Sequence, residues 1–480
     1  MQHTATEKLP EYRCADRVAE KRVQEIGKLR ARYLGTGKPG FPHRPVRRSK
    51  MAKALRKTEL IALLQECSEV FSFASRRAKI LPTLAWDREV AAEFFRKKGT
   101  ALPSPTYHVD KKAITEALEA LGGLHAKLQG EHPVLQWLLK TKDSFSAGIR
   151  LILALESDVF FEISTQLYGN SKSPLARGQT TNLDLARSIA GRMAVCSLND
   201  IEESRVMMSA EDLAASLEKR LRKRVPVLPV KVELTKDIVS KVVAGMSRVR
   251  IRADGRFSEM ELGALWNHEV ESHCLTAQNG SLQPHCSFLS AGGPRTTLTQ
   301  EGIAVFHEIY SHTMSQSRFL TICDRVEAIH MVEQGADFME LYRWFQARCE
   351  SDLEAFYAAQ RIFRGAPLGG RAPFTKDIVY LAGLLEVYHF LQAATKVQDR
   401  ILIECLLTGR IAMEDVGVIE WLRLNGILEP PHFIPVWLKN WEALVSFFSF
   451  FGVVLHSMDL SSFQSYFDSY QNVREWEHLK

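Results

Sequence analysis

Two histidines five residues apart, His268 and His273, constrain this chain more than any other feature of its sequence. In an ideal α-helix a step of five residues turns about 140° round the axis, so the two rings cannot converge on one ion. A π-bulge adds one residue to a helical turn, is frequent at functional sites, and returns residues five apart to one face. The sequence therefore predicts a distorted helix between His268 and His273.

The flanking residues predict that this helix follows a strand. Ser258, with Glu261 three residues later, forms a capping box, and Asn279-Gly280 predicts the end of the helix. Upstream, residues 248–252 alternate apolar and basic side chains with a period of two, which is typical of a half-buried strand. Residues 230–234 alternate in the same way, and we expect them to pair near the first strand.

Two imidazoles with nearby carboxylates are typical of a zinc site. Catalytic zinc is commonly held by two His and one Glu, which leaves a fourth position for water. His268, His273 and Glu301 are candidate ligands in this pattern, and Glu269 is the candidate base for the proton of the water. The same His-Glu-x-x-x-His pattern recurs at residues 307–312, so the pattern alone does not identify the ligands.

Longer stretches of the chain, from about residue 60 to about 440, resemble one known family. The first His-Glu-x-x-x-His copy and the segment 300–304, Gln-Glu-Gly-Ile-Ala, resemble bacterial proteins named for a QEGLA motif, relatives of the eukaryotic microtubule-associated tyrosine carboxypeptidases. Further matching residues are Asp158–Phe161, Leu167–Gly169, Leu275-Thr276, Asn279-Gly280, Arg361, Arg364-Gly365, Phe374–Asp377, Tyr380-Leu381 and Gly383. The resemblance implies that His268, His273 and Glu301 hold one Zn²⁺ per chain, and that His307 and His312 belong to a helix surface or core.

Two positions depart from the pattern of the relatives. Ile303 stands where they have Leu, a small change. Glu271 stands where they usually carry a small residue, and it would add a carboxylate near the metal.

The resemblance implies an α+β fold, a mostly helical, zincin-like metallopeptidase with a small β-sheet before the metal-binding helix. We expect one catalytic domain over residues 58–480. Its parts would be a helical region at 58–224, the sheet at 225–254, and the zinc helices with a C-terminal helical part at 255–480. A helix opening near Thr299 would place Glu301 in its first turn, where the helix dipole favours a carboxylate. Glu308, seven residues later, is a candidate partner for a zinc-bound His, with a plain exposed Glu as the alternative.

The resemblance also implies carboxypeptidase chemistry, the removal of a C-terminal residue from a peptide or protein by zinc-activated water. In the eukaryotic relatives that residue is a tyrosine. A terminal carboxylate is best bound by a guanidinium, which can donate two parallel hydrogen bonds. Arg364, Arg371 and Lys376, with Tyr380, are the candidates for substrate binding. Arg364 is preferred because Gly365 lets the backbone approach closely, and a solvent-exposed loop Arg is the alternative.

A second class of function fits the same residues. The name of the bacterial relatives points to modulation of another protein's expression, so the chain could be a non-catalytic zinc-binding regulatory protein that acts on a partner. A structural zinc site is usually closed by a fourth protein ligand. The open fourth position and Glu269 favour the enzyme.

The first 57 residues differ in charge from the remainder. Residues 1–58 hold 16 Lys and Arg against 5 Asp and Glu, a balance of +11 in a chain of net charge +6, so the body is slightly acidic. We expect a basic, flexible arm at 1–57 that could contact an acidic partner. Aromatic residues do not alternate with the charges after Phe41, which makes nucleic-acid binding an unfavoured interpretation.

Cysteine usage and hydropathy favour a cytoplasmic protein. The eight cysteines include no Cys-x-x-Cys pair, which argues against a disulfide framework or a cysteine metal site. Apolar runs such as residues 447–455 are about half the length that crosses a bilayer. We expect no signal peptide and no membrane span.

Overall fold

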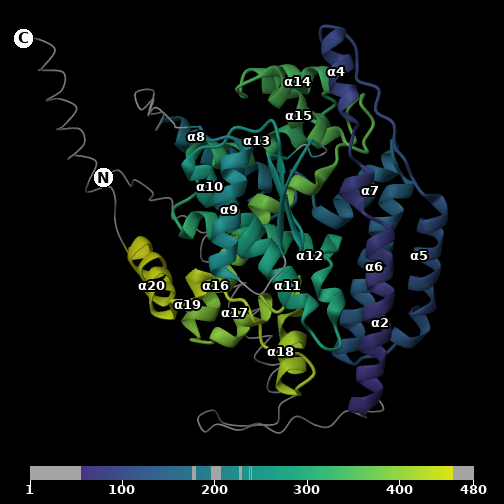
Figure 1. The fold of residues 1–480 in the computed structure, drawn as a ribbon, viewed down its shortest axis with the longest axis vertical. Helices are drawn as coiled ribbons and strands as arrows, with labels where there is room; N and C mark the ends of the chain where they lie inside the picture. The colour runs from purple at the N-terminus through teal and green to yellow at the C-terminus, as the bar shows by residue number, and fades with distance from the viewer. Residues whose placement is uncertain are drawn as a thin grey trace, which may run out of the picture.

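The computed structural model describes residues 56–175, 180–195, 207–225, 230–236, 238 and 240–457. Helices dominate this part of the chain, with one small sheet near its middle (Figure 1), as the sequence predicted. The basic arm expected at residues 1–57 lies outside the described residues except for its last two. The assignment of 58–480 to one catalytic domain remains a prediction.

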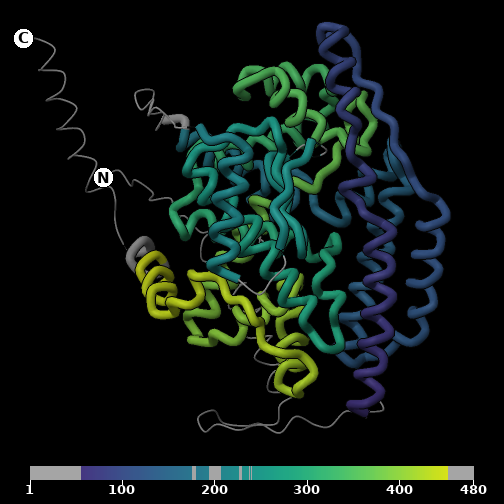
Figure 2. Tube along the Cα trace, in the orientation of Figure 1, coloured from purple at the N-terminus to yellow at the C-terminus, as the bar shows by residue number. Residues whose placement is uncertain are grey.

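Long helices of the N-terminal region form one side of the molecule (Figure 2). In α2 (Lys57–Arg77) the residues Leu60, Leu64, Cys67 and Phe71 recur at three- and four-residue steps, and all are buried. The other helices of this region are α3 (Ile80–Thr83), α4 (Arg88–Arg96), α5 (Lys111–Gly123), η1 (His125–Leu128), α6 (Pro133–Leu153) and α7 (Asp158–Tyr168). The helical stretch expected at 182–224 appears as α8 (Asn182–Val195) and α9 (Ala210–Arg224), and residues 196–206 between them lie outside the described part.

A three-stranded mixed sheet precedes the helix that carries the two histidines. Its strands are β1 (Lys231–Thr235), β2 (Val242–Ala244) and β3 (Arg248–Arg252), in the order β1-β3-β2. β1 pairs with β3 in parallel, and β2 pairs with β3 antiparallel. The two predicted strands and their pairing are therefore confirmed. The sequence missed β2, an edge strand of only three residues.

The remaining elements are helical. They are α10 (Glu259–Leu265), η2 (Trp266–Cys274), α11 (Leu275–Ser281), η3 (Ser287–Ser290), α12 (Pro294–Tyr310), α13 (Gln316–Glu333), α14 (Phe338–Gln346), α15 (Asp352–Phe363), η4 (Thr375–Asp377), α16 (Ile378–Lys396), α17 (Arg400–Leu406), η5 (Met413–Asp415), α18 (Val416–Leu424), α19 (Val436–Lys439) and α20 (Trp441–Ser457).

Helices α12 and α16 cross at two glycines. A Cβ atom built on Gly302 would lie 2.2 Å from the carbonyl oxygen of Gly383, and one built on Gly383 would lie 2.2 Å from the carbonyl oxygen of Leu298. Only glycine permits such an approach between two helix backbones. The crossing brings the segment that begins at Thr375 close to Glu301.

Buried apolar side chains form three clusters, of which two include residues of α12 and the third includes a residue of η2. The first joins α2, α5, α6 and α16–α18 and includes Ile303 and Phe306 of α12. The second joins α4, α7 and α13–α16 and includes Val305 of α12. The third joins α9, the sheet and α10–α11 and includes Val270 of η2. Side chains of α12 and η2 are therefore held by packing on several sides, which fixes their positions.

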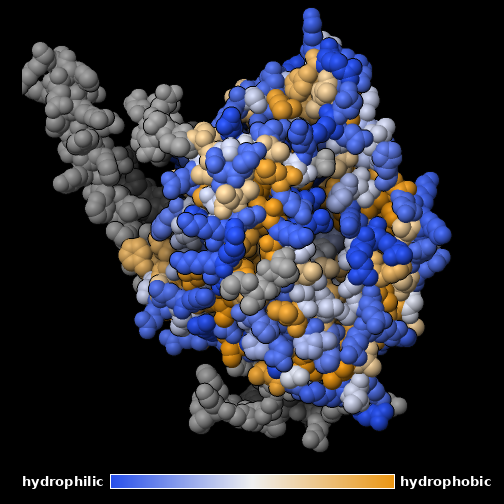
Figure 3. Space-filling view, in the orientation of Figure 1, coloured by the Kyte–Doolittle hydropathy of each residue, from blue (hydrophilic) through white to orange (hydrophobic). Residues whose placement is uncertain are grey.

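One described helix, Thr375–Lys396, is long and apolar enough to cross a bilayer by length and composition alone, but 72% of its most apolar window is buried inside the fold. Such burial is typical of a core helix. The shorter apolar helix α20 carries partly exposed aromatic side chains, among them Phe450, and its apolar surface is visible at the left edge of the space-filling view (Figure 3).

Candidate active site

The segment Trp266–Cys274 is a π-helix of nine residues between α10 and α11. Its i→i+5 hydrogen bonds return residues five apart to one face, so the predicted distortion between His268 and His273 is confirmed.

The predicted capping box at the start of α10 is confirmed as well, because Ser258 N donates to Glu261 Oε2 at 2.8 Å and Glu261 N donates to Ser258 Oγ at 3.2 Å.

The predicted stop at Asn279-Gly280 is wrong by a short distance, because α11 continues to Ser281. Both residues serve tertiary contacts. The side chain of Asn279 bonds the backbone of Leu407 and Phe433, and a Cβ on Gly280 would lie 2.3 Å from the carbonyl carbon of Leu289. Their residue types therefore reflect packing rather than helix termination.

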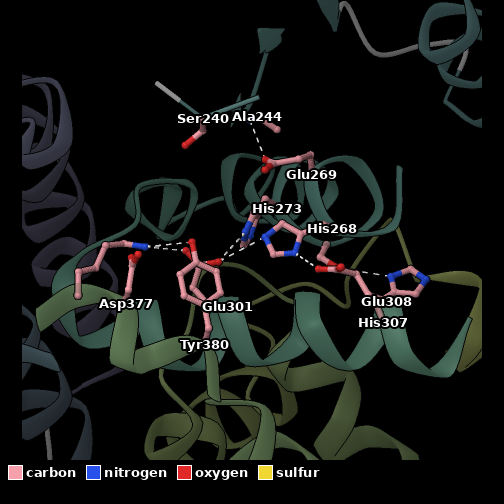
Figure 4. A network of polar contacts seen from close by, with 12 residues as sticks. Ser240, Ala244, His268, Glu269, His273, Glu301, His307, Glu308, Asp377 and Tyr380 are labelled. Carbon is pink, nitrogen blue, oxygen red and sulfur yellow. Dashed lines mark hydrogen bonds and ion pairs between the residues drawn. The ribbon is translucent and has the colours of Figure 1, made fainter. Parts of the chain in front are cut away.

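His268, His273 and Glu301 converge on one point. The Nε2 atoms of both imidazoles lie 3.4 Å from Glu301 Oε2, and the ligand atoms of the three residues lie within 4.8 Å of one another (Figure 4). In the part of the chain that the structure describes, no other group of three His, Cys, Asp or Glu side chains is arranged to hold a metal ion. α12 supplies Glu301, and η2 supplies both histidines.

The arrangement fits a metal cation. Within the described residues, Glu301 Oε2 is buried and has no hydrogen-bond partner, an orphaned state that is costly for a carboxylate unless a cation neutralises it. The other oxygen, Oε1, accepts a hydrogen bond from Lys376 Nζ at 2.9 Å. Burial disfavours the ionised carboxylate, but Lys376 and the two imidazoles hold the pKa of Glu301 well below its usual value. Two imidazole nitrogens and one carboxylate oxygen are a donor set that suits zinc.

Glu308 contacts the ring nitrogen of His268 that does not face Glu301. Its Oε1 lies 2.7 Å from His268 Nδ1, and Arg318 donates to both carboxylate oxygens at 3.2 Å. Burial acts against the charge of Glu308, but Arg318 and His268 lower its pKa to about 2. An ionised acceptor favours a proton on Nδ1, and Nε2 is the ring nitrogen that faces Glu301. The side chain of Glu308 is 1% exposed, so the alternative of a plain surface Glu is excluded.

The helix that carries Glu301 and Glu308 begins earlier than the sequence suggested. Pro294 occupies its first turn, and the Thr296 hydroxyl accepts a hydrogen bond from Gly293 N at 3.2 Å. Glu301 therefore lies in mid-helix, and the helix dipole does not explain its charge. The prediction that Glu308, seven residues later, contacts a candidate ligand histidine is confirmed, because the carboxylates of Glu301 and Glu308 both lie against the ring of His268.

The second His-Glu-x-x-x-His copy does not form a ligand set. His307 is buried beside Ser272, with Nδ1 3.3 Å from the Ser272 hydroxyl oxygen, and burial lowers the pKa of His307 to about 3, which keeps it neutral. His312 follows the end of α12 in a left-handed conformation with φ of 55° and is exposed. Only Glu308 of this copy reaches the first histidine pair.

Glu269 faces the same cavity as the two histidines and is held by the sheet. Its Oε2 accepts a hydrogen bond from Ala244 N of the edge strand β2 at 2.9 Å (Figure 4). The strand that the sequence missed thus positions the side chain predicted to act as base.

Glu271 pairs with a cation outside the group of candidate metal ligands. It is 2% exposed and pairs with Arg224 of α9, whose Nε and Nη2 lie 2.7 Å and 3.2 Å from the two carboxylate oxygens. Arg224 also donates to the carbonyl oxygen of Ile434 at 2.7 Å. The extra carboxylate therefore ties the π-helix to α9 and adds no ligand.

A cavity of about 1950 Å³ opens in front of these residues. Three of the four predicted substrate-binding residues line it, namely Arg364, Lys376 and Tyr380, whereas Arg371 does not line it and is exposed. Gly365 has a φ of 82°, and a Cβ there would lie 2.7 Å from Leu84 and Phe160, so this turn requires glycine.

The cations around Tyr380 differ in how they are paired. Arg361 forms an ion pair with Asp377 and donates to the Tyr380 hydroxyl at 3.0 Å, and Lys376 is paired with Glu301. Arg364 stacks over Phe374 at 5.4 Å, but among the described residues its guanidinium makes no hydrogen bond or ion pair, and its Nε is buried without a partner. Burial, reinforced by the charge of Arg361, lowers the pKa of Arg364 to about 10, still well above neutrality.

A second cavity residue whose guanidinium is unpaired within the described residues, Arg410, was not predicted from the sequence. It follows α17 and belongs to no recognised motif. Only its basic character was visible in the sequence. The structure places it in the lining of the cavity that also holds His268 and Glu269.

The chain is similar to one known protein family. The family model described as microtubule-associated tyrosine carboxypeptidase matches residues 92–455, most of the chain. The chain belongs to this family. Membership in the tyrosine carboxypeptidase family identifies the protein as a peptidase at the level of the family, acting on a peptide or protein. No curated protein matches the chain significantly.

Proposed function

We propose that this member of the family is a zinc carboxypeptidase that removes a C-terminal residue, in which His268, His273 and Glu301 hold one Zn²⁺ per chain. The observation that carries the proposal is the approach of two imidazole Nε2 atoms to Oε2 of Glu301, at the wall of a large cavity that Glu269 also lines. This oxygen is buried and has no hydrogen-bond partner among the described residues. Zinc bound there would supply a Lewis acid and would lower the pKa of a water molecule.

The residues of this chain supply the proton transfers and the orientation. Glu269 accepts a proton from the attacking water and returns it to the amine nitrogen as the peptide bond breaks. The hydrogen bond from Ala244 engages one oxygen of Glu269, which leaves the other for the water. Lys376 and Glu308 each fix one ligand, Glu301 and His268 respectively.

The exopeptidase specificity is assigned to Arg364. Its guanidinium lacks a carboxylate partner within the described residues and lines the cavity, which suits it to receive the terminal carboxylate of a peptide. The ring of Tyr380 lies 6.4 Å from that of His268 at 23° between planes, and Tyr380 would contact the residue that is released.

The deciding experiment combines metal analysis with a peptide library screened with the native protein. We expect one zinc per chain and cleavage of single residues from free-acid peptides, with amidated peptides as poor substrates. Equal cleavage of acid and amide peptides would identify an endopeptidase. Zinc binding without any cleavage would favour the non-catalytic regulatory protein.

A further inference from the structure

A second guanidinium in the cavity, that of Arg410, lacks a partner among the described residues. Arg410 lines the same cavity as Glu269 and Glu301. Within the described residues it makes no hydrogen bond or ion pair with its side chain, and its Nε is buried. Burial also lowers the pKa of Arg410. A desolvated guanidinium without a counter-charge is unfavourable unless an anion completes it.

The backbone that carries Arg410 is fixed against the ligand-bearing helices. Arg410 N donates to the carbonyl oxygen of Leu289 at 2.7 Å. A Cβ built on the preceding Gly409 would lie 2.6 Å from Leu289 Cβ and 3.2 Å from the Cα atom of Gly280, in the helix that continues η2. This turn is therefore packed directly onto the end of α11, the helix that continues the segment with His273.

The guanidinium of Arg410 lies at the N-terminal end of α12. A Cβ on Gly292, two residues before the first residue of α12, would lie 2.8 Å from Arg410 Nη1. Arg410 thus stands between the end of α11, which continues η2, and the start of α12, which supplies Glu301.

The electrostatic surroundings separate Arg410 from Arg364. The ionisable groups that act on Arg410 are Glu301, Cys274 and Glu269. The ionisable groups with the largest effects on Arg364 are Arg361, Asp377, Tyr380 and Tyr168, a different set. Arg410 is the guanidinium near the base and the carboxylate ligand, where the reacting carbonyl must lie.

The substrate presents two anionic positions to these two cations. One is the terminal carboxylate, which lies a residue beyond the cleaved bond, with about 3.8 Å between successive Cα atoms. The other forms during cleavage, when the oxygen of water bonds to the carbonyl carbon, the electron pair of the C=O double bond moves to the carbonyl oxygen, and the water proton passes to Glu269. The bond to nitrogen then breaks as that proton reaches the amine.

We propose that Arg410 is a catalytic residue that donates hydrogen bonds to the carbonyl oxygen of the cleaved peptide bond as negative charge develops on it, while Arg364 binds the terminal carboxylate. The inference rests on the proposed peptidase function. Its physical basis is the usual one for such donors, since a fixed cation in a desolvated site stabilises the transition state more than the ground state.

The kinetic test uses Arg410→Gln, Arg410→Lys and the matched change Arg364→Gln in the zinc-loaded, full-length protein. Loss of one such donor lowers kcat by about 10²- to 10³-fold. We expect Arg410→Gln to show this loss with little change in KM, and Arg410→Lys to recover part of it. Arg364→Gln should instead act chiefly on KM and on the preference for free-acid over amidated peptides.

A binding measurement gives a second readout. A phosphinic peptide carries a tetrahedral anion at the position of the cleaved bond, and we expect its Kd to weaken in Arg410→Gln by about the factor lost in kcat/KM, as for a transition-state analogue. The shortened peptide product should bind both forms alike. If Arg410→Gln folds poorly, Gly292→Ala replaces it in this test. The added methyl group keeps the guanidinium of Arg410 but displaces it, and should reproduce part of the loss of kcat and of phosphinic-peptide affinity.

The outcomes separate the two proposals. A native protein that cleaves no peptide rejects the peptidase function. Phosphinic-peptide binding and kcat that are independent of Arg410 and Gly292 reject the present inference. An Arg410→Gln variant with unchanged kcat and a raised KM for free-acid peptides alone would make Arg410 the terminal-carboxylate residue, which also overturns it.

Discussion

Replacing Gly302 by Ala should destabilise the protein at the crossing of α12 and α16. The new Cβ would lie 2.2 Å from the carbonyl oxygen of Gly383 and 2.4 Å from its carbonyl carbon. Ordinary contacts begin near 3.4 Å, so the two backbones must separate by about 1 Å. Overpacking of this kind costs up to about 3 kcal/mol, and replacement of a helical glycine returns about 1 kcal/mol. We expect the free energy of unfolding to fall by about 2 kcal/mol.

The same change should weaken metal binding, because Glu301 precedes Gly302 and Lys376 approaches Glu301 from the α16 side. Loss of a supporting contact to a ligand lowers metal affinity by about 10- to 100-fold. Urea denaturation and competition with a chromophoric chelator would measure the two effects. Gly191→Ala in α8 is the control, since a Cβ there meets nothing within 4 Å and should stabilise by up to about 1 kcal/mol. If both variants behave alike, the glycine crossing does not position the site.

Four further changes test the site more directly. His273→Ala should abolish stoichiometric zinc, whereas His307→Ala should retain it; the opposite result by metal analysis would assign the ligands to the second copy. Glu269→Gln should keep zinc and lose about 10²- to 10⁴-fold in kcat, the usual contribution of a positioned general base, and an unchanged rate on a verified substrate would reject that role. Arg364→Ala should lower kcat/KM for free-acid peptides by about ten- to a hundredfold, the equivalent of about 1.5 to 3 kcal/mol, and leave the slow cleavage of amidated peptides little changed. Deletion of residues 1–50 should preserve zinc binding and turnover of a short peptide, because their composition cannot form a core, and loss of folding would contradict this.

The parts of the fold that could be predicted are those with a local sequence pattern. The period-two alternation at residues 248–252 located β3, and the five-residue spacing of the histidines required the π-helix. β2 has only three residues and is held by pairing with β3, so no local pattern marked it. The start of α12 was missed because the sequence Gly293-Pro294 was not read as a helix start.

The candidate site could be predicted only where a motif carried it. Its candidate ligands and candidate base stood in recognisable segments, and the structure brings them together. The pairing of Lys376 with Glu301, 75 residues away, could not be read from either segment. The position of the Arg410 side chain depends on contacts between three segments that are distant in sequence, and no spacing rule connects these segments.

The π-helix also determines how this site can be found and altered. It acts as a one-residue insertion whose extra rotation is absorbed within nine residues, so that α10 and α11 keep ordinary α-helical geometry on either side. Deleting one residue between the histidines would restore the common four-residue spacing, but it would rotate everything beyond by about 100° or force α11 to shift along its axis. Asn279 and Gly280, which lock α11 to the loops at Leu289, Leu407 and Phe433, oppose both movements. The shorter and the longer motif are thus not interchangeable by a single deletion, and a search for the four-residue spacing would pass over this chain.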